Sequence, residues 1–332
     1  MSLKKIWSLY RRTSLPFNPT SPPHSLGSQG RYLVTAGFGR PYEEAAKRLR
    51  AQAERTGWFT DVITIGPSSD QLRAPQILQS IQDLQKEYPS GFGLWAWKPL
   101  LMLAACEMLP YGSHIYYVDA GCELSTRGRS RFSQLDRIVA DTGSLFFHLP
   151  FRNRDWTAPS VLAHFRVASQ RLQTQATWFA IKNDAKGTQL MAEWCAEATS
   201  DDFALLKGID QHQRVTSAHH RHDQSVLSSL LEAKHPHITT YPWEDFFAPW
   251  LYHRDSEILL APVHALRSRG PVGRLDRLID DRGTTSSFPV DSMGCRLRRS
   301  ALWIRFRLED ELRSAVDQVR TRRRIRALKD YK

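Results

Sequence analysis

The pattern of apolar and polar positions along the chain predicts alternating strands and helices. Short apolar runs bounded by turn residues indicate strands, and longer stretches with apolar residues three and four apart indicate helices. The predicted strands are residues 31–36, 61–65, 115–118, 145–149, 177–181 and 238–241. The predicted helices are residues 41–55, 77–88, 99–109, 187–199 and 224–234. Such alternation is typical of an α/β fold, so we expect a mostly parallel sheet flanked by helices.

Changes in composition divide the chain into four parts. Residues 13–30 are rich in Pro, Ser and Gly. This composition predicts an irregular N-terminal lead-in over residues 1–30. The α/β pattern covers residues 31–265. Residues 266–300, rich in Gly, Arg and Ser, predict a loop or linker. Residues 301–332 place apolar residues at helical spacing beside basic ones, which predicts a basic amphipathic helical tail.

The positive charge of the chain is concentrated in this tail. The 332 residues contain 46 Lys plus Arg against 34 Asp plus Glu, a formal net charge of +12, and residues 296–332 carry +8 of it. A basic amphipathic helix suits an anionic membrane surface. A solvated helix packed on the domain, and a site for a polyanion, are the alternatives. No recognition motif accompanies the tail, so we expect no nucleic acid as a partner.

The apolar segments bear on the cellular location. None approaches the length of a membrane-spanning helix, and we expect no secretory signal in the first residues. The four cysteines have no CxxC spacing, which argues against a zinc ribbon or a disulfide scaffold and favours a reducing compartment. We therefore expect a cytoplasmic protein, which the tail would hold peripherally on the inner face of the cytoplasmic membrane.

The turn from Thr35 to Tyr42 has the position of a phosphate-binding turn, because it follows a predicted strand and precedes a predicted helix. It contains Gly37 and Gly39, but Tyr42 stands where a third glycine would complete the dinucleotide-binding fingerprint. No Lys-Ser/Thr pair follows, so the segment is not a P-loop. A nucleotide phosphate or base against this turn, and a tight turn without a ligand, are both consistent with the pattern.

An acidic segment, IYYVDAGCE, ends the continuous apolar run at residues 115–118. Asp119 follows this run, then the small residues Ala120 and Gly121, and then Glu123. Ligands of open α/β sheets bind at the carboxyl ends of strands, and carboxylates suit a hard divalent cation that bridges a diphosphate. The alternative is that Asp119 caps the following turn. We favour a functional role because two carboxylates beside a buried strand repel each other unless a cation joins them.

Two further segments contain candidate chemistry. In GFGLWAWKP, Trp95 and Trp97 would point to opposite sides of an extended chain, so that one could stack on a sugar or base while the other packs in the core. Lys98 in the same segment could meet a phosphate. In RHDQSVLSSLL, His222 and Asp223 stand at the N-terminus of a predicted helix, and Asp223 as the N-cap is the structural alternative. The histidines show no zinc-ligand spacing.

The order of these segments resembles that in a group of bacterial glycosyltransferases. The order is TAGFGRPY, GFGLWAWKP, IYYVDAGCE, WFAIKN, Glu193-Trp194 and RHDQSVLS, within residues 31–255. The resemblance is to GT-A-like enzymes of surface-polysaccharide biosynthesis, which have G-[YF]-G-x-W-x-W-K-P, Y-x-D-A-G-C and H-R-H-D-Q-S segments. It implies a GT-A-like (Rossmann-like) fold. It also implies transfer of a sugar from a nucleotide-diphosphate-sugar donor to a polysaccharide or lipid-linked glycan acceptor.

The resemblance implies roles for individual residues. Asp119 would bind Mn²⁺ or Mg²⁺ and the donor diphosphate; Gly121 stands at the second acidic position of the D-x-D motif, so Glu123 or His253 would complete the metal shell. His222 and Asp223 would face the sugar or acceptor, with Asp223 as the candidate catalytic carboxylate. The candidate donor-binding residues are Thr35, Gly37, Tyr42, Trp95, Lys98, Asp119, Gly121 and Arg254. A sugar nucleotidyltransferase, or a non-enzymatic basic nucleic-acid-binding protein, is the alternative function.

Overall fold

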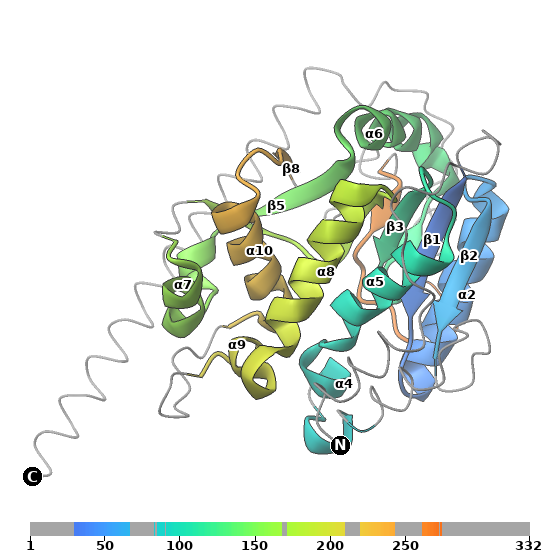
Figure 1. The fold of residues 1–332 in the computed structure, drawn as a ribbon. Helices are drawn as coiled ribbons and strands as arrows, with labels where there is room; N and C mark the ends of the chain where they lie inside the picture. The colour runs from blue at the N-terminus through green and yellow to red at the C-terminus, as the bar shows by residue number, and fades with distance from the viewer. Residues whose placement is uncertain are drawn as a thin grey trace, which may run out of the picture.

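A seven-stranded sheet runs through the middle of the molecule (Figure 1). The computed structural model describes residues 30–66, 83, 85–89, 91–167, 171–209, 220–242, 261–271 and 273. The strands of the sheet are β1 (Arg31–Ala36), β2 (Asp61–Ile65), β3 (His114–Val118), β5 (Ser144–Arg152), β6 (Leu172–Thr174), β7 (Trp178–Lys182) and β8 (Thr240–Pro242). Helices cover both of its faces, so the predicted α/β fold is confirmed.

The sheet combines a parallel half with antiparallel pairings. β1 pairs in parallel with β2 and β3, and β8 pairs in parallel with β5. β7 runs antiparallel to both β3 and β5, and β6 runs antiparallel to β5. The expected parallel arrangement therefore holds on the β2–β1–β3 side, while the sheet as a whole is mixed. An apolar run indicates burial on both faces but does not specify strand direction.

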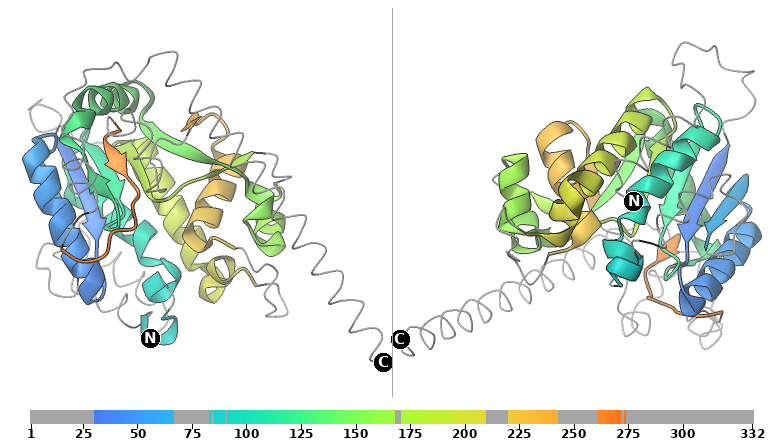
Figure 2. Two further views of the ribbon diagram at one scale, coloured as in Figure 1. Left: turned by 180° about the vertical axis from the view of Figure 1, so that it is seen from behind. Right: turned by 60° about the horizontal axis from the view of Figure 1, so that its bottom comes forward.

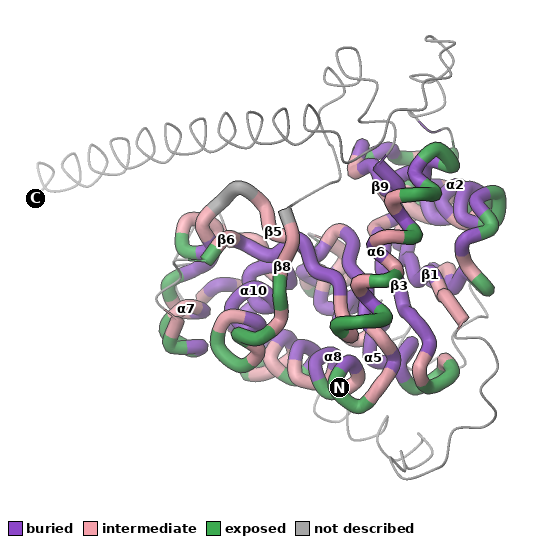
Figure 3. Tube along the Cα trace, turned by 90° about the horizontal axis from the view of Figure 1, so that it is seen from above, coloured by how far each residue is buried: buried purple, intermediate pink, exposed green. Residues whose placement is uncertain are grey.

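Alternate residues of the strands contribute to two separate cores. On one face, Val34, Tyr117 and Phe179 pack with α5 (Trp97–Met108), α8 (Ala185–Thr199) and α10 (His222–Lys234). On the other face, Leu33 and Tyr116 pack with α2 (Arg40–Thr56) and α6 (Arg129–Thr142). The central strand β3 is buried along its whole length (Figure 3). This is the helix–sheet–helix layering that the two-residue period of strands requires.

Most predicted boundaries lie within two residues of the observed ones. The predicted strands 31–36 and 61–65 coincide with β1 and β2, and the predicted helix 224–234 begins earlier, at His222. Of the predicted helix 77–88, only Asp83 and residues 85–87 are described as helical. The remaining helices are α4 (Gly91–Leu94), α7 (Pro159–Phe165) and α9 (Ala204–Lys207). Among the described helices, none has the length and apolar composition that a membrane span requires.

A small second sheet attaches a late segment of the chain to α2 (Figure 2, left). β4 (Glu123–Leu124) pairs antiparallel with β9 (Val263–His264). The buried guanidinium of Arg48 then donates hydrogen bonds to the carbonyl oxygens of Ala120, Cys122, Ser268 and Gly270, at 2.7–3.3 Å. Arg48 therefore fixes the turn after Asp119 and residues 268–270 to the same helix.

The predicted parts at the two ends of the chain lie largely outside the described residues. The lead-in 1–30 is described only at Gly30, the linker 266–300 only at residues 266–271 and 273, and the tail 301–332 not at all. The four-part division of the chain therefore stays a prediction.

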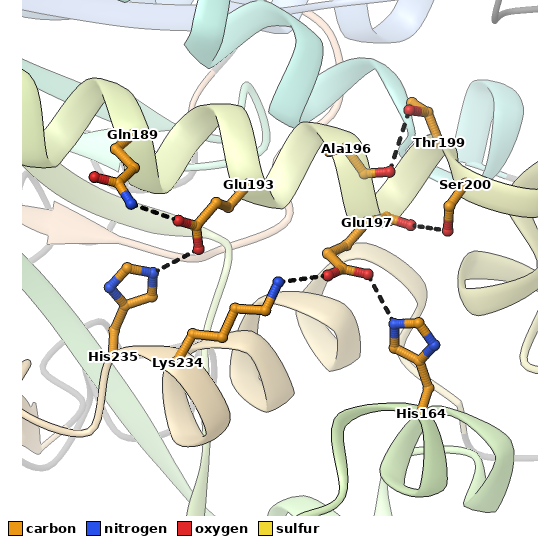
Figure 4. A network of polar contacts seen from close by, with 9 residues as sticks. All are labelled: His164, Gln189, Glu193, Ala196, Glu197, Thr199, Ser200, Lys234 and His235. Carbon is orange, nitrogen blue, oxygen red and sulfur yellow. Dashed lines mark hydrogen bonds and ion pairs between the residues drawn. The ribbon is translucent and has the colours of Figure 1, made fainter.

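Polar side chains on α8 connect this helix to its neighbours (Figure 4). His235, just after α10, lies 3.0 Å from Glu193, and Lys234 lies 2.8 Å from Glu197. His164 of α7 lies 2.8 Å from the other carboxylate oxygen of Glu197. These contacts fix the C-terminal end of α10, while its N-terminal end contributes His222 and Asp223 to the site described next.

Candidate functional site

Three of the predicted site residues meet at the carboxyl end of β3. Lys98 Nζ, from the first turn of α5, lies 3.2 Å from Asp119 Oδ1 and 3.0 Å from Asp223 Oδ2. Asp119 directly follows β3, and Asp223 belongs to the first turn of α10. Segments far apart in the sequence thus place two carboxylates around one ammonium group, which we call the Lys98 cluster. A cation does join two acids here, but it is a lysine, and the second acid is Asp223 rather than Glu123.

Lys98 is held from several sides. Its side chain is 3% exposed, and Nζ also donates a hydrogen bond of 3.0 Å to the carbonyl oxygen of Ala176. The ring centroids of Tyr117 and Trp97 lie 5.1 and 5.9 Å from Nζ. Burial alone would lower the pKa of Lys98, but the two carboxylates outweigh it and raise that pKa, so the ammonium stays charged. These contacts hold the charged ammonium between the two carboxylates.

Asp119 is the more accessible carboxylate of the cluster. Its side chain is 33% exposed, and its Oδ1 accepts a 2.6 Å hydrogen bond from the hydroxyl of Tyr117 in addition to the Lys98 contact. The other oxygen, Oδ2, has no hydrogen bond or ion pair with the described residues and is available to a ligand. The contacts of the Asp119 side chain are with the cluster, so the capping alternative is not what the structure shows.

Asp223 is the buried carboxylate of the cluster, with a side chain 7% exposed. Its Oδ2 lies 3.0 Å from Lys98 Nζ, and Lys98 is its ion-pair partner among the described residues. Burial raises the pKa of Asp223, and Lys98 opposes this. The N-cap of α10 is Arg221, so the alternative in which Asp223 caps the helix is wrong.

The residues between β6 and β7 supply backbone groups to the Lys98 cluster. Between β6 and β7, the amide of Ala176 donates to Gln224 Oε1 at 3.2 Å, and its carbonyl accepts from Lys98. The amide of Asp119 donates to the carbonyl of Thr177 at 2.8 Å. Gln224 in turn donates to the fully buried Gln173 at 2.7 Å. Neither glutamine was among the predicted site residues, because Gln173 lies in the short polar strand β6 and Gln224 in α10, and the sequence does not show that both are buried.

A left-handed turn precedes Lys98. All residues from Gly91 to Trp95 have positive φ, between 53° and 88°, and three of them are not glycine. Such residues are disfavoured by roughly 1–2 kcal/mol each, and strain of this kind is concentrated at functional sites. The segment is therefore not extended. The turn buries Trp97, whose Nε1 donates to the carbonyl of Gly91 at 3.1 Å, and leaves Trp95 half-buried.

Trp95 stacks on His222, the second predicted residue at the start of α10. Their ring centroids are 5.3 Å apart, with an interplanar angle of 26°. His222 Nδ1 lies 2.8 Å from the carbonyl oxygen of Leu206. Beside it, His220 Nε2 donates to Leu205, Nδ1 accepts from the amide of Ala158, and burial lowers the pKa of His220 to about 4. Two of the three segments that form the Lys98 cluster thus also form an aromatic contact.

The predicted phosphate-binding turn lies against the left-handed turn. The ring of Phe92 contacts Tyr42 edge-on at 5.9 Å and Phe38 at 6.0 Å. Gly37 has no room for a side chain, because a Cβ atom would overlap the carbonyl oxygen of Tyr42. Thr35 is fully buried, and its hydroxyl has no hydrogen-bond partner within the described part of the chain. Gly37 therefore has a packing role, and Tyr42 is the half-buried side chain that this turn offers to a ligand.

The described residues do not fit the expected Mn²⁺ or Mg²⁺. Glu123 is fully buried and accepts a hydrogen bond from the hydroxyl of Ser268, and the Lys98 ammonium already contacts Asp119. No group of three or more His, Cys, Asp or Glu side chains suited to a metal occurs within the described ranges. His253 and Arg254 lie outside them. Because divalent cations need several oxygen or nitrogen ligands, we derive no step through a metal.

Comparisons with known proteins give only distant similarities. No protein-family model and no curated protein matches the sequence. Mouse xyloside xylosyltransferase 1 in its apo form is 12% identical over 73% of this chain and 100% of its own, with a TM-score of 0.38. The galactosyltransferase LgtC with donor and acceptor sugar analogues is 11% identical over 80% and 99%, with a TM-score of 0.40. The bifunctional glycosyltransferase WbbM is 10% identical over 79% and 51%, with a TM-score of 0.42. These values establish neither a family nor an activity for this chain.

Proposed function

We propose that this chain is a glycosyltransferase that moves a sugar from a nucleotide-diphosphate-sugar donor to a polysaccharide or lipid-linked glycan acceptor. The observation that carries the proposal is the Lys98 cluster. Its residues come from GFGLWAWKP, IYYVDAGCE and RHDQS, the segments on which the family resemblance depends, and they lie within 3.2 Å of one ammonium group. Their position at the end of a central strand is where open α/β sheets bind ligands.

Within this proposal Asp119 is the carboxylate that meets the substrate. It is one-third exposed and keeps one oxygen free of the described residues, whereas Asp223 is buried. Asp223 was the expected catalytic carboxylate, but its burial favours a positioning role in which it holds Lys98 and, through Lys98, orients Asp119. Removal of either buried charge would leave the other uncompensated, so the pair is suited to fixing geometry.

Transfer requires two changes of bonding at the sugar. The bond between the anomeric carbon and the diphosphate oxygen breaks, and its electron pair leaves with the nucleoside diphosphate. The acceptor oxygen bonds to the anomeric carbon, and its proton goes to a base or to solvent. A preoriented carboxylate near the sugar can bind a hydroxyl or stabilise the positive charge that develops on the ring. Asp119, fixed by Tyr117 and Lys98, has the geometry for either task.

Trp95 lies three residues before Lys98 in the chain, and His222 directly precedes Asp223. We therefore place these two half-buried, stacked side chains at the edge of the same site, where they orient the donor or acceptor sugar. Thr35, Gly37 and Gly121 would contribute backbone to the donor site, and Tyr42 a side chain. The membrane surface as a partner of residues 301–332, a peripheral cytoplasmic location and the role of Arg254 remain predictions.

A panel of donors tests the proposed function. The full chain is incubated with UDP-, GDP-, CMP- and dTDP-sugars, and the released nucleotide is identified by chromatography. We expect one donor to release its nucleoside diphosphate, and Asp119→Asn to lower the rate by about 100-fold or more. Asp141→Asn, on an exposed position of α6, is the matched control and should be unchanged. Pyrophosphate released from a sugar 1-phosphate and a nucleoside triphosphate, with no nucleoside diphosphate released from any sugar donor, would indicate a nucleotidyltransferase instead. An unaffected Asp119→Asn variant would contradict the site.

A further inference from the structure

Residues 266–270 connect the two segments expected to bind the donor. The amide of Ser268 donates to the carbonyl of Gly121 at 2.9 Å, which attaches these residues to the turn after Asp119. The amide of Gly270 donates to the carbonyl of Pro41 at 2.8 Å, which attaches them to the start of α2, within the predicted phosphate-binding turn. Figure 2 (left) shows the segment after β9 passing beside α2. Sequence analysis placed these residues in a linker.

Hydrogen bonds of buried side chains hold the backbone of residues 266–270 in place. Ser268 is buried, its hydroxyl donates to the buried carboxylate of Glu123, and Arg48 donates to the carbonyls of Ser268 and Gly270 at 3.3 and 2.7 Å. Arg267 and Arg269, on either side of Ser268 in the chain, are exposed. Two guanidinium groups are thus carried by an ordered stretch of backbone.

Arg267 lies beside the turn that follows Asp119. Its Cα would be 3.4 Å from a Cβ atom on Gly121, so the two stretches of backbone approach closely. Arg267 also has φ of 51°, a left-handed conformation that is uncommon for a non-glycine residue and that is concentrated at functional sites. The backbone of Arg267 therefore lies beside Gly121, which is two residues after Asp119 in the chain.

Arg269 lies at the other predicted donor segment. Its guanidinium carbon is 5.5 Å from the ring centroid of Tyr42, which belongs to the predicted phosphate-binding turn. Neither Arg267 nor Arg269 forms an ion pair with any acidic side chain in the described part of the chain. Two positive charges without a negative partner, between two candidate donor-binding turns, favour an anionic ligand.

We propose that Arg267 and Arg269 bind the diphosphate of the nucleotide-sugar donor. The inference rests on the proposed glycosyltransferase function and deepens it. Guanidinium groups bind phosphate oxygens in a bidentate manner, and here they would neutralise the charge that the family resemblance assigns to a divalent cation. The described residues offer no ligand set for such a cation, whereas they place both arginines beside the turns expected to hold the donor.

Calorimetry with nucleoside diphosphates tests this site without relying on turnover. UDP, GDP and dTDP are titrated into the full chain in EDTA, and again with Mg²⁺. At least one should bind, and Arg267→Gln and Arg269→Gln should each raise its Kd by about 10-fold in EDTA, since a charge-assisted contact is lost. The corresponding lysine variants should recover only part of the affinity. Arg55→Gln, on an exposed position of α2, is the control and should bind as the natural chain does.

The outcomes separate this inference from the proposed function. Full affinity in both glutamine variants would overturn the diphosphate site, and so would the absence of binding by any of the three nucleotides. Arginine-dependent binding without turnover of any donor would support the site and contradict the glycosyltransferase function. Thermal unfolding of each variant checks that the fold is intact, which we expect because both side chains are exposed.

Discussion

Replacement of Lys98 by methionine tests whether the Lys98 cluster is an interacting unit. Methionine has a similar length and fills the same buried volume, but it removes the charge from between Asp119 and Asp223. The Asp223 carboxylate would then be 7% exposed with no described cation beside it. A buried carboxylate without a partner takes up a proton or destabilises the fold. We therefore expect the free energy of unfolding at neutral pH to fall.

The magnitude follows from the contacts of Lys98. At an effective dielectric constant of about 20, two unit charges about 3 Å apart attract each other by about 5 kcal/mol before the cost of desolvation. Removal of one partner of a buried ion pair costs about 3–5 kcal/mol, mainly because the other charge stays buried. The Asp119 contact adds less, because that carboxylate is 33% exposed. We expect Lys98→Met to lose about 3–5 kcal/mol.

A double-mutant cycle measured by urea unfolding isolates the interaction. Lys98→Met, Asp223→Asn and the double variant are compared, and we expect a coupling energy of at least about 1.5 kcal/mol between the two sites. Lys47→Met is the matched control, because Lys47 is 67% exposed and pairs with Glu44 on the surface; its loss should stay below about 1 kcal/mol. Single variants that each lose less than about 1 kcal/mol, with additive effects, would refute the reasoning.

Three further predictions follow from other contacts. Arg48→Lys should lower the unfolding free energy by about 2 kcal/mol or more, because lysine cannot reproduce a guanidinium that donates to four carbonyls. The same variant should increase the amide hydrogen exchange of residues 266–270. Unchanged exchange would contradict the anchoring by Arg48. Gly37→Ala should lower the free energy of unfolding by about 1–3 kcal/mol, measured by thermal unfolding, because its Cβ atom would overlap the backbone of Tyr42. Gly121→Ala should cost little, because the nearest atom to its Cβ is 3.4 Å away. Equal losses in the two variants would contradict the packing role of Gly37. Burial lowers the pKa of His264 from 6.5 to about 4, so the folded protein binds fewer protons than the unfolded chain between these values, and stability present above about pH 6.5 is lost as the pH falls toward 4. Between pH 7 and pH 5 the loss of unfolding free energy that His264 causes should be about 2 kcal/mol, measured by urea unfolding. This part of the pH dependence should disappear in His264→Gln. An unchanged pH dependence in that variant would count against the buried neutral imidazole.

Local pattern was sufficient for most of the elements. The strands β1 and β2 match the predicted ranges because an apolar run bounded by polar residues carries both the burial and the length of a strand. The position of Asp119 at the end of a buried strand followed from the same pattern. Strand direction did not, because the apolar run of β7 is compatible with either direction, and its pairing with β3 depends on the rest of the sheet.

The contacts within the site could not be predicted from the sequence, because they depend on segments distant in the chain. We expected a metal ion to supply the positive charge between two acidic side chains. Lys98, 21 residues before Asp119, supplies it instead, and the left-handed turn before α5 gives Lys98 its position. Residues 266–270 had a linker composition, and hydrogen bonds with Arg48 and with the carbonyl of Pro41 attach them to α2. Positive φ at Leu94 and Trp95 has no sequence signal, since neither is a residue that favours this conformation.

The nucleotide released from a sugar donor, in the presence and absence of the Asp119 carboxylate, tests the central claim most directly. The full chain and Asp119→Asn are incubated with the donor that the panel identifies, and the products are separated by chromatography. The proposed function predicts a nucleoside diphosphate from the natural chain and about 100-fold less from the variant. No release of a nucleoside diphosphate, or equal release by the two proteins, would contradict it.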